Sequence, residues 1–400
     1  MRGTAGPPSD RALFIGIAAT QVIGWGAIFV PFPLLLTQME AELGWSRALI
    51  NGAYTSGLLA GGIAAIPVGR YVDRHGARAL MGWGALVSAA LLFASSRVTE
   101  PWHFFAVWIA MGLAQAACLW GPAMAVVVAL ARDPARCITA ITFVTGMTAT
   151  GFLPLADQLI GAFGWRGAQV TFCVMQVLSS IIAFWLLWRE PKPGAPTTAR
   201  KPLRLVEAMR SRAFAGLALC FAAHAFVATG LGAHLIPMLR ERGLPEGLAL
   251  LVAALHGPTQ VAARGVLYFA GSRVSVRGVG MLATALLPVA MLTLALAGGS
   301  LGITLCFVLA MAVADGLITI IRATGVMEIL GRENFGATTG AMSAIAMLPR
   351  TLAPVTLALI WQEAGGYGPV PWLLLAVAAM AAACFSMAAT APRADHAARR

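Results

Sequence analysis

Charged residues are scarce in this sequence. Only 11% of its 400 residues are Asp, Glu, Lys or Arg, and lysine accounts for two of the 28 basic residues, whereas an ordinary soluble domain carries about 25% charged residues. Hydrophobic residues make up 59% of the chain, and its mean hydropathy is +0.80. This composition excludes a soluble enzyme and indicates an integral membrane protein.

Cysteine pairs and metal-ligand clusters are also missing. The six cysteines stand singly in or beside apolar stretches, with no CxxC pair and no histidine at ligand spacing. Isolated cysteines of this kind are typical of small packing residues rather than of disulfides or metal sites. We therefore predict no bound metal and no cofactor.

Apolar stretches of about the length of a membrane-spanning helix recur along the chain. A helix needs about 20 apolar residues to cross a bilayer, so twelve spans leave room here only for tails and short connections. We expect all of them to be helices, because lipid cannot satisfy the exposed edge of a sheet. The predicted spans are 13–36, 48–68, 80–95, 102–130, 138–163, 169–188, 214–239, 249–269, 279–296, 301–327, 337–361 and 371–389.

The basic residues predict the orientation of these spans. Of the 28 Lys and Arg residues, 20 fall on the side that holds both termini and five on the opposite side. Cytoplasmic connections carry the excess of basic residues, so both termini are expected in the cytoplasm, and the expected location is a bacterial inner membrane. The basic residues of the cytoplasmic connections account for the net charge of +12. Because this charge needs no nucleic-acid partner to explain it, we predict no binding of nucleic acid.

The chain divides near its middle into two halves that repeat. The pattern GxGAxxxP occurs in the first span of each half, at 24–31 and again at 230–237. Paired repeats with a binding site between them are characteristic of secondary transporters. The predicted parts are a cytoplasmic tail at 1–12, a six-helix bundle at 13–188, a basic cytoplasmic linker at 189–213, a second six-helix bundle at 214–389 and a cytoplasmic tail at 390–400.

One motif stands out between the second and third spans. On the predicted cytoplasmic side the chain reads Gly69-Arg70-Tyr71-Val72-Asp73-Arg74-His75-Gly76-Ala77-Arg78, or GxxxDRxGxR. A connection that only set the topology would explain the arginines, but neither the glycines nor Asp73. Together with the twelve spans, the basic linker and the repeat, this loop resembles the signature loop of the major facilitator superfamily.

That resemblance implies an all-α integral membrane protein with the major facilitator fold, in which twelve transmembrane helices form two pseudo-symmetric six-helix bundles. It also implies a transporter and not an enzyme. In the family the loop aspartate faces the cytoplasmic end of the eleventh span, here 336–338, where a helix N-terminus favours negative charge. The loop arginines meet the end of the fourth span. The conformational latch implied by the resemblance consists of Gly69, Asp73, Arg74, Gly76, Arg78 and Asp133.

Shorter motifs resemble one branch of the family. Gly24-Trp25-Gly26, Gly44-Trp45-Ser46-Arg47, Gly164-Trp165-Arg166 and Arg264 stand where the monocarboxylate and oxalate:formate antiporter branch has similar residues. In that branch, cations on spans 8 and 11 hold the substrate carboxylates, which implies this role for Arg264 and Arg350. Proton-coupled monocarboxylate members have an Asp where this chain has Gln260, and glutamine cannot take up a proton.

Arginines inside the predicted spans indicate an anion site. Charge within a bilayer is costly, so it usually faces a bundle interior or a wet cavity and is a functional candidate by default. A guanidinium offers a planar fork of donors that matches a carboxylate, and it stays charged. Arg264 and Arg350 therefore predict substrate binding. The alternative is an internal ion pair, for instance of Arg350 with Asp315.

Three further residues are candidates for carrying protons. Asp315 lies near the middle of span 10, where burial favours an uncharged carboxyl, and Asp157 lies near the outer end of span 5. His234 could titrate near neutral pH. For His234 we favour a hydrogen-bonded core histidine, and we favour that interpretation more strongly still for His224 and His256.

The predicted function is secondary active transport of a small organic anion, a mono- or dicarboxylate, by alternating access. We expect membrane lipid, the solute and either protons or a counter-anion as partners, and a monomeric chain. The alternatives are a proton-driven exporter of drugs or metabolites and, more distantly, a membrane enzyme, for which no convergent nucleophile, base and acid are present. Beside the two arginines, the predicted cavity residues are Trp25, Tyr54, Gln115, Trp120 and Gln260, with ordinary packing as the alternative for each.

Overall fold

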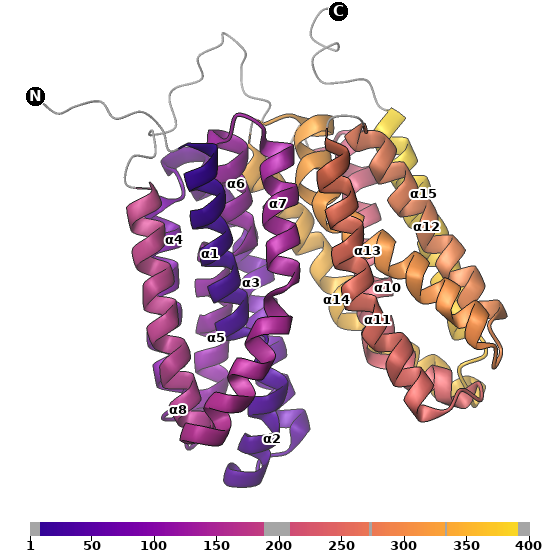
Figure 1. Ribbon diagram of the computed structural model, residues 1–400, viewed down its shortest axis with the longest axis horizontal. Helices are drawn as coiled ribbons and strands as arrows, with labels where there is room; N and C mark the ends of the chain where they lie inside the picture. Colours follow the sequence, from indigo (N-terminus) through magenta and orange to yellow (C-terminus); the bar gives the residue numbers. More distant parts are fainter. Residues whose placement is uncertain (1–8, 188–208, 272–273, 333, 391–400) are drawn as a thin grey trace, which may run out of the picture. The chain divides into compact units, whose positions relative to one another are not determined.

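The computed structural model describes residues 9–187, 209–271, 274–332 and 334–390, and all regular structure in these ranges is helical (Figure 1). Most of the predicted linker at 189–213 and parts of both predicted tails lie outside the described residues. The helices are α1 (Asp10–Ile28), α2 (Phe32–Leu43), α3 (Arg47–His75), α4 (Arg78–Ser95), α5 (Pro101–Cys118), α6 (Trp120–Leu130), α7 (Pro134–Gly146), α8 (Thr148–Leu186), α10 (Arg212–Glu241), α11 (Glu246–Ala270), α12 (Val276–Leu296), α13 (Leu301–Leu330), α14 (Phe335–Ala364) and α15 (Val370–Thr390).

The chain forms two compact units. Unit 1 comprises Met1–Pro202 together with Asn334–Ala341, and unit 2 comprises Leu203–Glu333 together with Met342–Arg400. The piece 334–341 holds the first turns of α14. These turns therefore belong with the N-terminal helices, although they are distant from them in sequence.

Ten segments of the described chain are long and apolar enough to cross a membrane. One of them, Pro134–Leu186, has 53 residues and covers the fifth and sixth predicted spans, which join at Gly164 with a φ of 67°. The helix α11 is not among the ten, because His256, Gln260 and Arg264 lower the hydropathy of its apolar stretch. With α11 added and Pro134–Leu186 counted as two, the helices account for the twelve predicted spans.

Three predicted spans of the first half are interrupted, whereas we expected single helices. The first divides into α1 and α2 at 29–31, the fourth into α5 and α6 at Leu119, and the fifth into α7 and α8 at Met147. The break at Leu119 has a local cause, because Pro122 lacks an amide hydrogen and its ring excludes the carbonyl of Cys118 four residues earlier. The Nε2 atom of Gln21 on α1 donates to that carbonyl at 3.2 Å. A side chain thus replaces the missing helical bond.

Residues of the short glycine motifs tie the end of α2 to the bend of α8. Gly44 ends α2 and Gly164 interrupts α8, each with a φ of 67° in the left-handed region that favours glycine. Glu42, in the last turn of α2, accepts hydrogen bonds from Trp165 Nε1 and from Arg166 Nε, the latter at 2.9 Å. These motif residues therefore have structural partners within unit 1.

Glycines let α3 and α5 cross with their backbones in contact. A Cβ atom added at Gly112 would lie 1.9 Å from the carbonyl oxygen of Gly57, and one added at Gly57 would lie 2.4 Å from the carbonyl oxygen of Trp108. Close approach through small residues is a main source of helix packing in membranes. Because a helix backbone cannot turn aside as a side chain can, this crossing requires glycine at both positions.

Replacing Gly112 by alanine should destabilise unit 1. The added methyl group must push α3 and α5 apart, and overpacking of this kind costs about 1–3 kcal/mol, so we expect a lower melting temperature in detergent. Gly151→Ala in α8 is the matched control, because nothing lies within 4 Å of a Cβ at that position. A Gly112→Ala protein that melts at or above the wild-type temperature would contradict the crossing.

Candidate functional site

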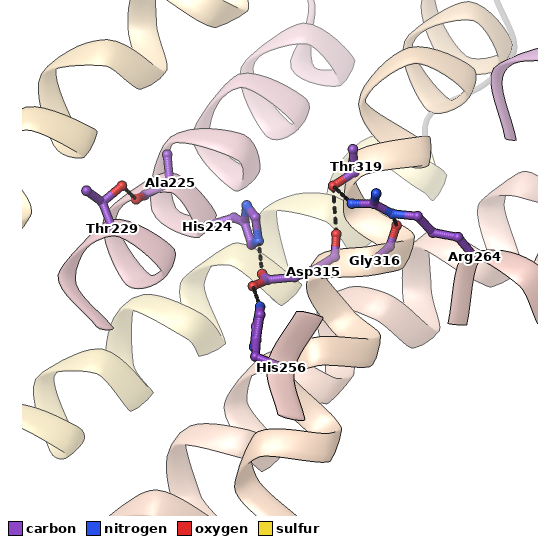
Figure 2. A network of polar contacts seen from close by, with 8 residues as sticks. All are labelled: His224, Ala225, Thr229, His256, Arg264, Asp315, Gly316 and Thr319. Atoms are coloured by element: carbon purple, nitrogen blue, oxygen red, sulfur yellow. Dashed lines mark hydrogen bonds and ion pairs between the residues drawn. The ribbon is translucent and has the colours of Figure 1, made fainter. Parts of the chain in front are cut away.

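The contact between α11 and α13 in unit 2 places Arg264 against α13. Gly316 permits this contact, because a Cβ atom there would lie 2.7 Å from the carbonyl oxygen of Gln260. Arg264 is 6% exposed, and its guanidinium donates from Nε to the carbonyl of Gly316 at 3.4 Å and from Nη2 to the hydroxyl of Thr319 at 3.3 Å (Figure 2). The Thr319 hydroxyl in turn donates to the backbone carbonyl of Asp315 at 2.8 Å. Arg264 is thus joined to the turn of α13 that carries Asp315.

Two histidines from different helices hold the carboxylate of Asp315 (Figure 2). The Nε2 atom of His224 on α10 lies 2.5 Å from Oδ1, and the Nε2 atom of His256 on α11 lies 3.0 Å from Oδ2. An ionised carboxylate only accepts hydrogen bonds, so both Nε2 atoms donate. We call His224, Asp315 and His256 the histidine–aspartate triad. Its three members come from three helices, so it fixes α10, α11 and α13 with respect to one another.

Two further arginines lie in the spans of unit 2. The guanidinium of Arg322 on α13 stands 5.7 Å from the ring centroid of Phe221 on α10, in a cation–π contact. Arg350 on α14 is exposed, and its charge repels that of Arg322. Among the described residues of unit 2, Asp315 is the single buried acid, beside the buried Arg264 and the half-buried Arg322.

His234 on α10 is held by two neutral partners. Its Nε2 atom lies 2.9 Å from the carbonyl oxygen of Pro354, and its Nδ1 atom lies 2.8 Å from the hydroxyl of Tyr367. A carbonyl only accepts, so Nε2 donates and the lone pair of Nδ1 accepts from the tyrosine. Burial, and then the charge of Glu241, raise the pKa of Tyr367 above its ordinary value, which keeps that hydroxyl protonated. The neutral ring of His234 satisfies both partners, as expected for a core histidine.

The predicted cavity residues of the first half lie in unit 1, where Trp25 packs against Cys118 and Leu119 at the break between α5 and α6. Trp25 and Tyr54 both contact Phe29, with ring centroids 4.6 Å and 6.1 Å from it. Gln115 and Trp120 flank the same break. Gln115 is 7% exposed, and its Oε1 atom has no hydrogen-bond partner among the described residues.

The loop aspartate lies at the N-terminus of α14, within unit 1. Its Oδ1 atom accepts from the amide of Gly336 at 2.9 Å, and its Oδ2 atom accepts from the amide of Ala337 at 2.8 Å. The first amides of a helix lack helical partners and carry the positive end of its dipole, and the carboxylate of Asp73 supplies acceptors to two of them. Gly69 permits the approach, because a Cβ atom there would lie 2.1 Å from the carbonyl oxygen of Gly336.

The other predicted latch residues lie at the ends of α3, α4 and α7. Gly76 ends α3 with a φ of 82°, Arg74 is exposed, and Arg78 begins α4. Asp133 caps the N-terminus of α7 by accepting from the amide of Arg136 at 3.1 Å. The pairing of loop arginines with Asp133 and the role of the loop as a conformational latch stay predictions.

Comparison with known protein families matches residues 15–354 to the Major Facilitator Superfamily. The chain belongs to this family. The resemblance inferred from the loop at 69–78 is thereby confirmed at the level of the superfamily. As a family member, the chain is a multi-pass membrane transporter rather than an enzyme.

Solved structures show the same fold. A major facilitator superfamily transporter, FucP, in its outward conformation superposes with a TM-score of 0.74 at 14% identity, over 94% of this chain and 96% of that one. The human organic anion transporter MFSD10 gives 0.72 at 16% identity, over 95% and 100%. The proton:xylose symporter XylE gives 0.69 at 12% identity, over 94% of each chain. No curated protein matched the sequence. At these identities the likeness concerns the fold alone.

The structure brings only some of the predicted site residues together. Gln260, Arg264 and Asp315 meet at the contact of α11 with α13, whereas the exposed Asp157 lies on α8 in unit 1. The prediction omits His224 and His256, which it treats as core histidines. Both are ionisable residues in apolar spans, and the rule that selected Asp315 would have selected them as well.

Removing the carboxylate of Asp73 should loosen the first turn of α14. Loss of a carboxylate that caps a helix costs about 1 kcal/mol, so Asp73→Ala should speed amide hydrogen exchange at Gly336 and Ala337 about fivefold. The matched control is Asp133→Ala, which removes the cap of α7 and should speed exchange at Arg136 alone. Exchange at Gly336 and Ala337 that stays at the wild-type rate would show that the two hydrogen bonds do not hold this turn.

Proposed function

We propose that this major facilitator protein is a secondary transporter of a small organic anion, a mono- or dicarboxylate, in a bacterial inner membrane. In this proposal it belongs to the monocarboxylate and oxalate:formate branch, keeps both termini in the cytoplasm, and works by alternating access. The main observation in support of this proposal is the distribution of charged residues in the spans of unit 2. Away from their first and last turns, the described spans of this unit contain Arg264, Arg322 and Arg350 but only one acid, Asp315.

The position of Arg264 supports a role in binding the anion. Its guanidinium is buried between α11 and α13, and it donates to a carbonyl and to a hydroxyl, which are neutral acceptors. In low dielectric a fixed charge of this kind attracts a carboxylate strongly, and the planar fork fits both of its oxygens. The carboxylate of Asp315 meanwhile accepts from two histidines.

The charge distribution favours an anion over a neutral sugar. The solved neighbours include a proton:xylose symporter as well as an organic anion transporter, so their names do not choose between these substrates. A sugar offers hydroxyl groups and needs no permanent cation, whereas the planar fork of a guanidinium matches a carboxylate. The arginines of unit 2 therefore support a carboxylate as the cargo.

Neutralising Arg264 should weaken substrate binding. We expect Arg264→Gln to raise the KM for radiolabelled lactate or oxalate at least about tenfold in proteoliposomes, which corresponds to about 1.4 kcal/mol of lost binding energy. Arg264→Lys should fall between this variant and the wild type, because lysine keeps the charge but lacks the fork.

Arg97→Gln is the control for loss of an arginine, because Arg97 is exposed in the connection after α4. It should leave uptake unchanged. Saturable carboxylate uptake by a protein that carries both Arg264→Ala and Arg350→Ala would refute the anion site, as would wild-type protein that transports xylose and neither carboxylate.

A further inference from the structure

The histidine–aspartate triad contains three titratable side chains that touch one another inside unit 2 (Figure 2). The side chain of Asp315 is 10% exposed and that of His224 is 13% exposed, whereas that of His256 is 32% exposed. The triad thus has a buried end at His224 and an open end at His256.

The hydrogen bonds define where a further proton can bind. Each Nε2 atom already donates to the carboxylate, so the remaining basic position of each imidazole is Nδ1. A carboxylate that accepts two N–H donors is favoured in its ionised form. The Nδ1 atoms of the imidazoles are therefore the positions of the triad at which a further proton can bind.

The charges around the triad make proton uptake and anion binding support each other. The triad itself brings together His224 from α10, His256 from α11 and Asp315 from α13, and the charge of Asp315 attracts that of Arg264 on α11. The only ionisable residue of α12 is Arg277, which pairs with Glu328 at 3.7 Å near the helix ends. With both imidazoles neutral, the triad carries one negative charge, which Arg264 balances. One added proton leaves the triad and Arg264 with a net charge of +1, which an anion can neutralise.

We propose that the histidine–aspartate triad is the proton-binding site of this transporter, so that one proton and one organic anion cross the membrane together. This inference rests on the proposed function. The proton comes from water on the uptake side and adds to Nδ1 of His256, which turns the imidazole into an imidazolium; on the opposite side the same proton returns to water. Asp315 holds the imidazolium, and His224 holds the carboxylate from its buried side.

Two other candidates lack such an arrangement. The hydrogen bonds of His234 are complete with a neutral ring, through Pro354 and Tyr367. Asp157 is exposed on α8 in unit 1. In the triad, by contrast, His256 shares one helix, α11, with the fixed cation Arg264.

The test uses the full-length protein in proteoliposomes, with radiolabelled lactate and radiolabelled oxalate as probes. Exchange of labelled for unlabelled carboxylate needs no net proton movement, whereas accumulation driven by an acidic exterior requires it. For the wild type we expect both activities, and we expect one proton to leave the medium with each carboxylate that enters. Because coupling is reciprocal, carboxylate affinity should rise by up to about tenfold per pH unit as the pH falls from about 8 to about 6.

Asp315→Asn is the decisive variant. It removes the charge of the carboxylate, so the triad is neutral without a proton, as the wild-type triad is after one proton has bound. We expect it to retain exchange, to lose accumulation driven by the pH gradient, and to bind carboxylate equally at high and low pH. The double variant His224→Gln and His256→Gln should lose the pH dependence between about pH 6 and 8. His103→Gln, at the exposed start of α5, is the matched control and should behave as wild type.

The outcomes separate the two proposals. If the wild type exchanges carboxylates without taking up protons, the triad is not the coupling site, and the proposed anion transport still stands. This measurement uses the wild-type protein, so it does not depend on whether a variant folds. Gradient-driven accumulation that persists in Asp315→Asn or in the double histidine variant would also overturn the triad. Absence of exchange with both carboxylates in the wild type would overturn the proposed function and the inference together.

Discussion

A charge inside a membrane-spanning helix must find its partners within the protein, because lipid offers none. In unit 2 this constraint acts at Asp315. Its carboxylate is held from α10 by His224 and from α11 by His256, and Arg264 on α11 bonds to the neighbouring turn of α13. The positions of three helices are therefore tied to a single acid. The proposed binding of an anion and of a proton both start from this arrangement, since one uses the permanent charge beside the acid and the other uses its two titratable neighbours.

Glycine supplies the short distances that these polar contacts need. Gly316 brings the backbone of α13 to that of α11 beside Gln260, and Gly69 brings α3 to the first turn of α14 at Gly336. In each case a donor and an acceptor lie within hydrogen-bond distance because no side chain separates the two helices. The glycines of the loop at 69–78 thus have a role that its arginines cannot fill, which is why this motif identifies the family more sharply than a basic connection would.

Much of the fold could be predicted because the bilayer constrains each span separately. Composition, span length and the distribution of arginines indicate a helical membrane protein without reference to any contact, and the loop around Asp73 then indicates the superfamily. Interruptions within spans were harder to foresee. The break at Leu119 depends on Pro122, but it is stable in the structure because Gln21, nearly 100 residues away, bonds to the carbonyl of Cys118.

The sequence by itself determined the class of the protein, its family and the identity of Arg264 and Asp315 as unusual residues, because hydropathy and charge are properties of each helix alone. The tertiary structure decided which of these residues meet. A residue's position in a helix specifies the face on which it lies, but not the neighbour that this face contacts. Only the packing of α10, α11 and α13 therefore distinguishes His224 and His256, which share one carboxylate, from His234, whose partners are a backbone carbonyl and a tyrosine.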